Sequence, residues 1–383
     1  MLINTKEELD SLHMNGLLRT LCSAESEAGR MIVINSREYI NYASNNYLGL
    51  ANHPGVKQAA IDAVKRFGTG STASRLIAGN LLIHEELERA LAELKHTSSA
   101  LVFPTGYQTS IGIITACVGR GDIVLIDRLC HASLVDAVRI SGAQLLVYPH
   151  NDPSALERII RRSKPNIQKL IVTDGVFSMD GDIAPLKELS RTARQYDAVL
   201  LVDDAHGTGV LGPTGSGSVE QSGIDHENLI SMGTLSKALA SQGGFVCGDR
   251  NLRSFFINKA RSFIYTTGLN PAACGAALKA VEIIRTESGR RHRLIQRADT
   301  LRYKLGQMGF DTGNSQTPII PVIIGDTAET VALAGLLFEH GIYCPAIRPP
   351  TVKKGSARLR ISVTAEHTDQ DIDALVSVFK EHA

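Results

Sequence analysis

The sequence lacks tryptophan, is poor in other aromatic residues and has no excess of either charge. Only 10 Phe and 9 Tyr occur in 383 residues, and 40 basic against 39 acidic side chains leave a formal net charge of +1. Proteins that bind nucleic acid or a membrane surface need a basic field. No apolar run approaches the ~20 residues that span a bilayer. We therefore expect no nucleic-acid partner and no membrane partner.

The sequence also lacks closely spaced cysteines and a signal peptide. Zinc sites and the disulfide frameworks of small secreted domains need short cysteine spacings, so we predict no metal site. The first residues contain neither the basic segment nor the apolar segment of a secretory leader. A cytoplasmic protein is expected. The six cysteines are Cys22, Cys117, Cys130, Cys247, Cys274 and Cys344.

Glycine, by contrast, is abundant, and short apolar runs alternate with helical patterns from about residue 54. The 34 glycines make up about 9% of the chain, against ~7% in average proteins. Continuous Val, Ile and Leu strands between helices are typical of a mostly parallel sheet that is covered on both faces. Strands are expected at 31–35, 39–43, 100–103, 122–126, 144–148, 170–173, 198–202, 229–232, 245–247, 319–324, 343–347 and 359–363.

The pattern changes after residue 270 to longer helices and fewer strands. We predict an α/β fold with three parts: an N-terminal helix and short strands over 1–45, a large domain over 46–270, and a smaller α+β domain over 271–383. Thr5 and Glu8 have the spacing of a capping box, and leucines continue to Leu21, which predicts one opening helix. Further helices are expected at 81–95, 107–118, 133–140, 185–196, 271–306, 327–340 and 368–382.

The most informative segment is the strand 198–202, which runs directly into Asp203, Asp204 and His206. Ligands of open α/β sheets bind at the carboxyl ends of strands. An aspartate at this position can instead merely cap the next turn, but a nearby histidine favours a functional role. The following glycines match G-x-G-x-x-G, yet Pro213 excludes the helix that a dinucleotide site requires. We interpret that segment as a loop, which disfavours a nicotinamide or flavin enzyme.

A lysine among small and apolar residues is the second signal. Lys237 follows an apolar strand directly, whereas most lysines lie on solvated surfaces. Burial lowers the pKa of a lysine and makes its amine a nucleophile. Gly106 and Tyr107 begin a helix after another strand, and free N–H groups there can bind an anion. His131 precedes a further helix and could equally serve as its cap.

Together these residues supply what pyridoxal phosphate needs: an amine, a carboxylate, a ring that can stack and a phosphate cradle. The chain resembles the α-oxoamine synthases, a branch of the fold type I (aspartate-aminotransferase-like) pyridoxal-phosphate enzymes, over essentially its whole length. The matching motifs are Ser44-Asn-Asn-Tyr-Leu-Gly-Leu50, Gly70-Ser-Thr-Ala-Ser-Arg-Leu76, Asp174-Gly-Val-Phe-Ser-Met-Asp-Gly181, Val202-Asp-Asp-Ala-His-Gly207, Gly233-Thr-Leu-Ser-Lys237 and Phe263-Ile-Tyr-Thr-Thr267.

The resemblance implies roles for five residues around the cofactor ring. Lys237 bonds covalently to pyridoxal phosphate and later moves protons at the substrate α-carbon. Asp203 pairs with the pyridinium nitrogen and keeps it protonated. His131 stacks on the ring and is our candidate donor to the oxyanion at the thioester carbonyl. Ser178 and His206 hydrogen-bond the phenolic oxygen.

The resemblance also implies contacts to the phosphate and to the amino-acid substrate. Gly106, Tyr107 and Thr234 reach the phosphate, and Thr267 does so from the second subunit of a homodimer. Arg360 forms a bidentate pair with the substrate carboxylate, a task suited to its planar fork.

Three further residues are assigned to substrates by the same resemblance. Asn45 lies near the amino acid, and Arg19 and Thr351 are candidates for the acyl group. Asp174 departs from the family pattern, in which glutamate is common, so no role is assigned to it.

Several tail residues are most similar to the family members that condense L-alanine with a pimeloyl thioester of coenzyme A or acyl-carrier protein. They are Ile347-Arg-Pro-Pro-Thr-Val352, Gly355 and Arg358-Leu-Arg-Ile361. A glycine-using acyltransferase is the alternative within the same chemistry. A non-catalytic subunit that keeps the fold is another alternative, but it would not need Lys237.

Overall fold

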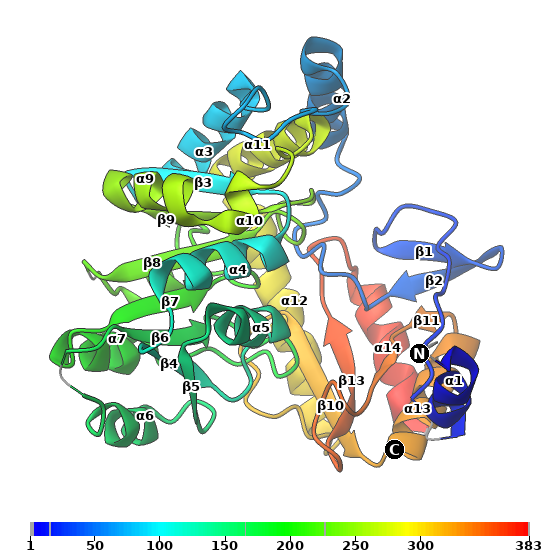
Figure 1. The fold of residues 1–383 in the computed structure, drawn as a ribbon. Coiled ribbons are helices and arrows are strands. Elements are labelled where there is room, and N and C mark those ends of the chain that lie inside the picture. Colours follow the sequence, from blue (N-terminus) through cyan, green and yellow to red (C-terminus); the bar gives the residue numbers. More distant parts are fainter. Residues whose placement is uncertain (1–3, 15–16, 165, 226, 382–383) are drawn as a thin grey trace.

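The computed structural model describes residues 4–14, 17–164, 166–225 and 227–381. Figure 1 shows a large sheet domain beside a smaller lobe that contains both chain ends. The helices are α1 Thr5–Met14, α2 Pro54–Phe67, α3 Leu82–Leu94, α4 Gly106–Cys117, α5 Ala132–Ser141, α6 Pro153–Ile160, α7 Leu186–Gln195, α8 Ser218–Ser222, α9 Arg250–Lys259, α10 Arg261–Ile264, α11 Pro271–Thr286, α12 Ser288–Gln307, α13 Thr327–Glu339 and α14 Asp369–Glu381. The strands are β1 Met31–Ile34, β2 Arg37–Asn41, β3 Ser99–Phe103, β4 Ile123–Asp127, β5 Gln144–Tyr148, β6 Lys169–Asp174, β7 Val199–Asp203, β8 Leu229–Thr234, β9 Gly244–Gly248, β10 Ile319–Gly325, β11 Ile342–Tyr343, β12 Ala346–Ile347 and β13 Ala357–Ser362.

The large domain is built on a seven-stranded sheet in the order β3-β9-β8-β7-β6-β4-β5. All neighbours are parallel except β9, which runs antiparallel to both β8 and β3. Helices cover both faces, so β3, β4 and β6 are buried along their whole lengths. This confirms the predicted mostly parallel sheet. The register brings Asp174, Asp203 and Met232 side by side at one edge.

The smaller lobe contains two three-stranded sheets, β10-β13-β12 and β1-β2-β11. The long helix α12 lies between this lobe and the large sheet, whereas α11 packs against α2 and α3 (Figure 1). Strand β2 pairs with β11, so the N-terminal strands belong to the same lobe as the C-terminal ones. The domain boundaries at residues 45 and 270 stay predictions.

The prediction of one opening helix reaching Leu21 was wrong. Helix α1 ends at Met14, where the Leu12 carbonyl accepts the N–H groups of Leu17 (2.8 Å) and Leu18 (3.1 Å) and closes the last turn. The cap also differs: the Asn4 side chain, rather than Thr5, accepts the Glu7 N–H at 3.4 Å. No residue of α1 is buried, so no tertiary packing extends the helix beyond its local signals.

The predicted strand at 343–347 was wrong as a single element. The segment divides into β11, which pairs with β2, and β12, which pairs with β13. A chain that passes from one sheet to another cannot remain one strand. The predicted helix 271–306 is likewise two helices, α11 and α12. The end of the last helix at residue 382 lies outside the described residues, and none of the helices within them is long and apolar enough to cross a membrane.

Candidate active site

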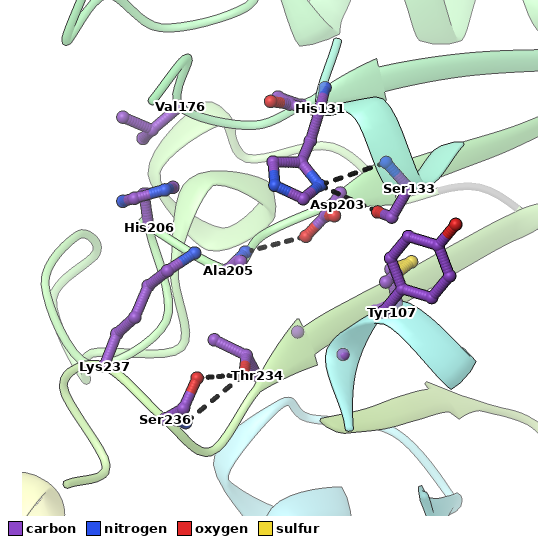
Figure 2. A pocket seen from close by; sticks show the side chains of 14 residues that line it. Tyr107, His131, Ser133, Val176, Asp203, Ala205, His206, Thr234, Ser236 and Lys237 are labelled. Carbon is purple, nitrogen blue, oxygen red and sulfur yellow. Dashed lines mark hydrogen bonds between the residues drawn. The ribbon is translucent and has the colours of Figure 1, made fainter. Parts of the chain in front are cut away.

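A cavity of about 240 Å³ opens at the carboxyl ends of β6, β7 and β8. Seven of the predicted site residues line it, and Figure 2 shows how the labelled side chains among them lie around it. These seven are Gly106, Tyr107, His131, Asp203, His206, Thr234 and Lys237; the rest of the lining is Ser133, Asp174, Val176, Ala205, Met232, Gly233 and Ser236.

Lys237 supplies a partly buried amine at one end of this cavity. It follows β8 in a segment where Leu235 and Ala238 are buried. Burial lowers the pKa of Lys237 to about 8, an effect that Asp203 and Asp174 partly oppose. Among the described residues nothing hydrogen-bonds the amine. A side chain of this kind is a nucleophile and a proton carrier near neutral pH.

Two carboxylates lie across from the lysine at adjacent strand ends. Asp203 ends β7 and pairs in register with Asp174 at the end of β6. One Asp203 oxygen accepts the Ala205 N–H at 3.0 Å, and burial raises the pKa of Asp203. The pKa of Asp174 is raised well above its usual range by burial and by Asp203. Asp174 accepts the His131 N–H at 3.2 Å, so it supports the cavity wall.

His131 both caps helix α5 and faces the cavity. Its Nδ1 accepts the Ser133 N–H at 3.3 Å and lies 2.8 Å from the Ser133 hydroxyl. The two interpretations of this histidine are therefore compatible. Burial lowers the pKa of His131, and Lys237 lowers it further against the opposing charge of Asp203. His131 is therefore a neutral imidazole whose Nδ1 is hydrogen-bonded to Ser133.

A polar cradle lies at the start of α4. The Thr105 hydroxyl caps this helix by accepting the Gln108 N–H at 3.1 Å. The N–H groups of Gly106 and Tyr107, which begin the helix, have no partner in the part of the chain that is described. The Thr234 and Ser236 hydroxyls, 2.8 Å apart, lie beside them. A side chain at Gly244 would bring its Cβ to 2.7 Å from the Gly106 Cα, so glycine is required there. Such a helix start with hydroxyls binds an anion such as phosphate.

Arg360, Asn45 and Ser178 meet outside the cavity lining. Arg360 on β13 donates to Asn45 Oδ1 at 3.1 Å, to the Ser362 hydroxyl at 2.8 Å and to the carbonyl of Ser178. It also lies 3.5 Å from the hydroxyl of Tyr47, which in turn is 2.7 Å from His206 Nδ1. This chain of contacts connects the smaller lobe to the cavity.

The other predicted residues lie elsewhere. Arg19 and Thr351 are exposed and hydrogen-bonded to each other at 3.2 Å. Thr267 forms an isolated bridge with Ser74. None of these three predicted residues, Arg19, Thr351 and Thr267, appears in the cavity lining.

Three residues of the site, Ser133, Ser236 and Tyr47, were not predicted from the sequence. Tyr47 lies within the motif 44–50 and Ser236 is next to Lys237, so motif position was the available signal for both. Ser133 was missed because its hydroxyl comes within hydrogen-bond distance of His131 Nδ1 only when helix α5 has formed.

The residues present fit pyridoxal phosphate. The Lys237 amine suits its aldehyde, and Asp203 suits its ring nitrogen. The His131 imidazole face suits the ring, and the α4 cradle suits the phosphate. Each complementary group comes from a different element, and all face one cavity.

Comparisons with known proteins agree with this geometry. The family model for aminotransferase class I and II matches residues 37–379. Two relatives named 8-amino-7-oxononanoate synthase are 44% identical over 98% of this chain and 95% of the relative (Thermoanaerobacter pseudethanolicus) and 46% identical over 97% and 95% (Geobacter sulfurreducens).

Solved structures show the same fold. A serine palmitoyltransferase from S. paucimobilis with a bound PLP–myriocin aldimine superposes with a TM-score of 0.93 at 31% identity, covering 99% of this chain and 96% of that one. An 8-amino-7-oxononanoate synthase from Francisella tularensis gives 0.78 at 28% identity, covering 90% and 97%. The chain therefore belongs to the aminotransferase class I and II family of pyridoxal-phosphate enzymes, alongside the 8-amino-7-oxononanoate synthases in its α-oxoamine synthase branch.

Proposed function

We propose that this chain condenses L-alanine with a pimeloyl thioester, forming 8-amino-7-oxononanoate for biotin biosynthesis and releasing carbon dioxide and the free thiol. The observation that carries the proposal is the extent of similarity: six relatives of that name are 43–46% identical over 97–98% of the chain. The cavity supports it because it contains the amine, carboxylate and cradle that this chemistry requires. A glycine-using acyltransferase such as glycine C-acetyltransferase is not favoured.

Pyridoxal phosphate would be held by residues that line the cavity, together with Ser178, which lies outside the lining. When bound, this cofactor supplies an electron sink that stabilises negative charge at the substrate α-carbon. Lys237 would anchor it, Asp203 would pair with its ring nitrogen, and His131 would lie against its ring. Gly106, Tyr107 and Thr234 would bind the phosphate, while His206 and Ser178 would serve the phenolic oxygen.

The chain's own residues would then orient substrate and move protons. The Lys237 amine, with a pKa of about 8, can take a proton from the α-carbon and return it near neutral pH. Arg360 provides the positive charge for the alanine carboxylate, with Asn45 beside it. His131 is our candidate donor to the thioester oxyanion. The Arg19 and Thr351 pair would contact the acyl group.

Assembly and location are further parts of the proposal. Thr267 lies outside the lining of its own chain's cavity, which suits a contribution to the phosphate site of a partner subunit in a homodimer. Scattered cysteines suit a reducing compartment, and we place the enzyme in the cytoplasm.

A two-by-two substrate assay tests the function. Thiol release is measured with alanine or glycine against pimeloyl-CoA or acetyl-CoA, with pimeloyl-acyl-carrier protein as a further donor. Fastest release with alanine and a pimeloyl thioester is expected. A preference for glycine with acetyl-CoA would overturn the proposal, and no release with any pair would favour the non-catalytic subunit.

A further inference from the structure

Two buried tyrosines lie five residues apart after β2, and each contacts a histidine. The Tyr42 ring stacks on His367, with centroids 4.2 Å apart and planes at 15°. Its hydroxyl has no hydrogen-bond partner in the described part of the chain. The Tyr47 ring meets His206 edge-on at 6.0 Å, and its hydroxyl lies 2.7 Å from His206 Nδ1. Of these two histidines, His206 and His367, only His206 lines the cavity.

The protons around the Tyr47 hydroxyl can be assigned from the donor and acceptor inventory. Arginine only donates, so Arg360 Nη2 donates to Asn45 Oδ1 at 3.1 Å and toward the Tyr47 oxygen at 3.5 Å. Burial raises the pKa of Tyr47, so its hydroxyl keeps a proton. That single proton can go to Asn45 Oδ1 at 3.1 Å or to His206 Nδ1 at 2.7 Å. The shorter contact and the arginine already serving Asn45 favour His206.

We propose that Tyr47 is a positioning residue that donates its proton to Nδ1 of His206 and thereby holds His206 in the Nε2–H tautomer. The hydrogen bond at one ring nitrogen decides which nitrogen carries the proton. His206 Nε2 has no partner among the residues described, which leaves its N–H for the cavity. Figure 2 shows the His206 ring beside Lys237 at one end of that cavity, away from Ser133.

The assignment matters because His206 is neutral. Burial lowers the pKa of His206 well below its usual range, and the nearby Lys237, Arg360 and His131 lower it further. A neutral imidazole presents either a donor or a lone pair. An Nε2–H donor suits the anionic phenolic oxygen of the proposed cofactor, whereas a lone pair would repel it, so this step rests on the proposed function.

The first test reads the tautomer directly in cofactor-free protein. Two-bond ¹H–¹⁵N spectra of protein labelled with ¹⁵N-histidine distinguish the two neutral tautomers, and His206→Gln identifies the signal. We expect the Nε2–H form in the wild type and in Tyr42→Phe, and a mixture of tautomers in Tyr47→Phe. An Nδ1–H form in the wild type would overturn the proposal whether or not Tyr47→Phe folds.

The second test measures the affinity of the cofactor-free protein for pyridoxal phosphate. One hydrogen bond of ordinary strength corresponds to a loss of about 3- to 10-fold for Tyr47→Phe. Tyr42→Phe is the matched control, since it removes a hydroxyl without a partner, and its affinity should not change. Equal affinities of the two variants would contradict a positioning role. Neither readout depends on which amino acid or thioester is used, so a failure here is separate from a failure of the substrate assay.

Discussion

Asp203 and Asp204 are neighbours in the chain with opposite surroundings. Asp204 is fully buried and saturated: it accepts the Lys95 amine at 2.7 Å and the Ser218 N–H at 3.0 and 3.2 Å. Lys95 also donates to Thr208 and to the carbonyl of Ser216. Asp203 accepts the Ala205 N–H on one oxygen, and its side chain lines the cavity.

Glycines make the saturated site possible. A Cβ at Gly217 would lie 1.7 Å from Asp204 Oδ2, one at Gly207 2.1 Å from Oδ1, and one at Gly175 2.9 Å from Oδ1. The glycine excess of the sequence is thus partly explained by a carboxylate enclosed in backbone. Burial alone does not indicate function, because the group available for chemistry is the one whose hydrogen-bonding capacity the protein leaves unused.

The largest effect is expected at Lys237, opposite Asp203. Lys237→Ala removes the only amine among the described residues that line the cavity and should lower thiol release at least about 10³-fold. The melting temperature of the variant serves as the control for folding. A rate within tenfold of the wild type would show that the cavity is not the active site.

Replacing each aspartate by asparagine tests whether Asp204, rather than Asp203, stabilises the fold. Asp204→Asn leaves the buried Lys95 ammonium without its counter-charge, so the free energy of unfolding should fall by about 3–5 kcal/mol. Asp203→Asn is the matched control: burial raises the pKa of Asp203, so its charge is costly and its removal should not destabilise the protein. Urea unfolding of cofactor-free protein measures both. Equal losses of stability in the two variants would show that both aspartates stabilise the fold to the same extent.

Activity should separate the same pair in the opposite sense. Asp203→Asn should lower turnover about 10²-fold or more, because a neutral amide cannot keep the ring nitrogen protonated. Folded Asp204→Asn, assayed well below its melting temperature, should retain more activity than Asp203→Asn. The reverse order would contradict the assigned roles.

The pH dependence of stability tests the lowered pKa of Lys237. The pKa of Lys237 is about 8 in the folded chain, against ~10.4 when unfolded. Between these values the unfolded state binds more protons, so this group makes the cofactor-free protein more stable as pH rises from 8 to 10, on the order of 1–3 kcal/mol. Lys237→Met should lack that rise. Parallel pH profiles of the two proteins would indicate a normally charged lysine.

The smallest effect is expected for an ion pair on the surface. Arg285 and Glu93 lie 2.7 Å apart, but each is about half exposed. Solvent screens such pairs, so Glu93→Gln should change the free energy of unfolding by less than about 0.5 kcal/mol. A loss comparable to that of Asp204→Asn would mean that burial does not decide the strength of these pairs.

Most of the large domain could be predicted from local patterns. The seven strands of its sheet appear where apolar runs were found, because strands buried on both faces consist of continuous Val, Ile and Leu residues. Strand ends followed by Asp203 and Lys237 indicated the cavity for the same reason. The errors lie where tertiary contacts decide, as in the unburied helix α1 and the segment divided between β11 and β12.

Local sequence patterns were therefore enough to predict the alternation of elements, the strand ends that carry reactive side chains and the family. Which of these side chains have hydrogen-bond partners could be seen only in the tertiary structure. Lys95 reaches Asp204 across 109 residues, Tyr47 reaches His206 across 159, and Asn45 reaches Arg360 across 315. No local pattern encodes such pairs, since they form only when distant elements pack, and they distinguish a structural carboxylate from a reactive one.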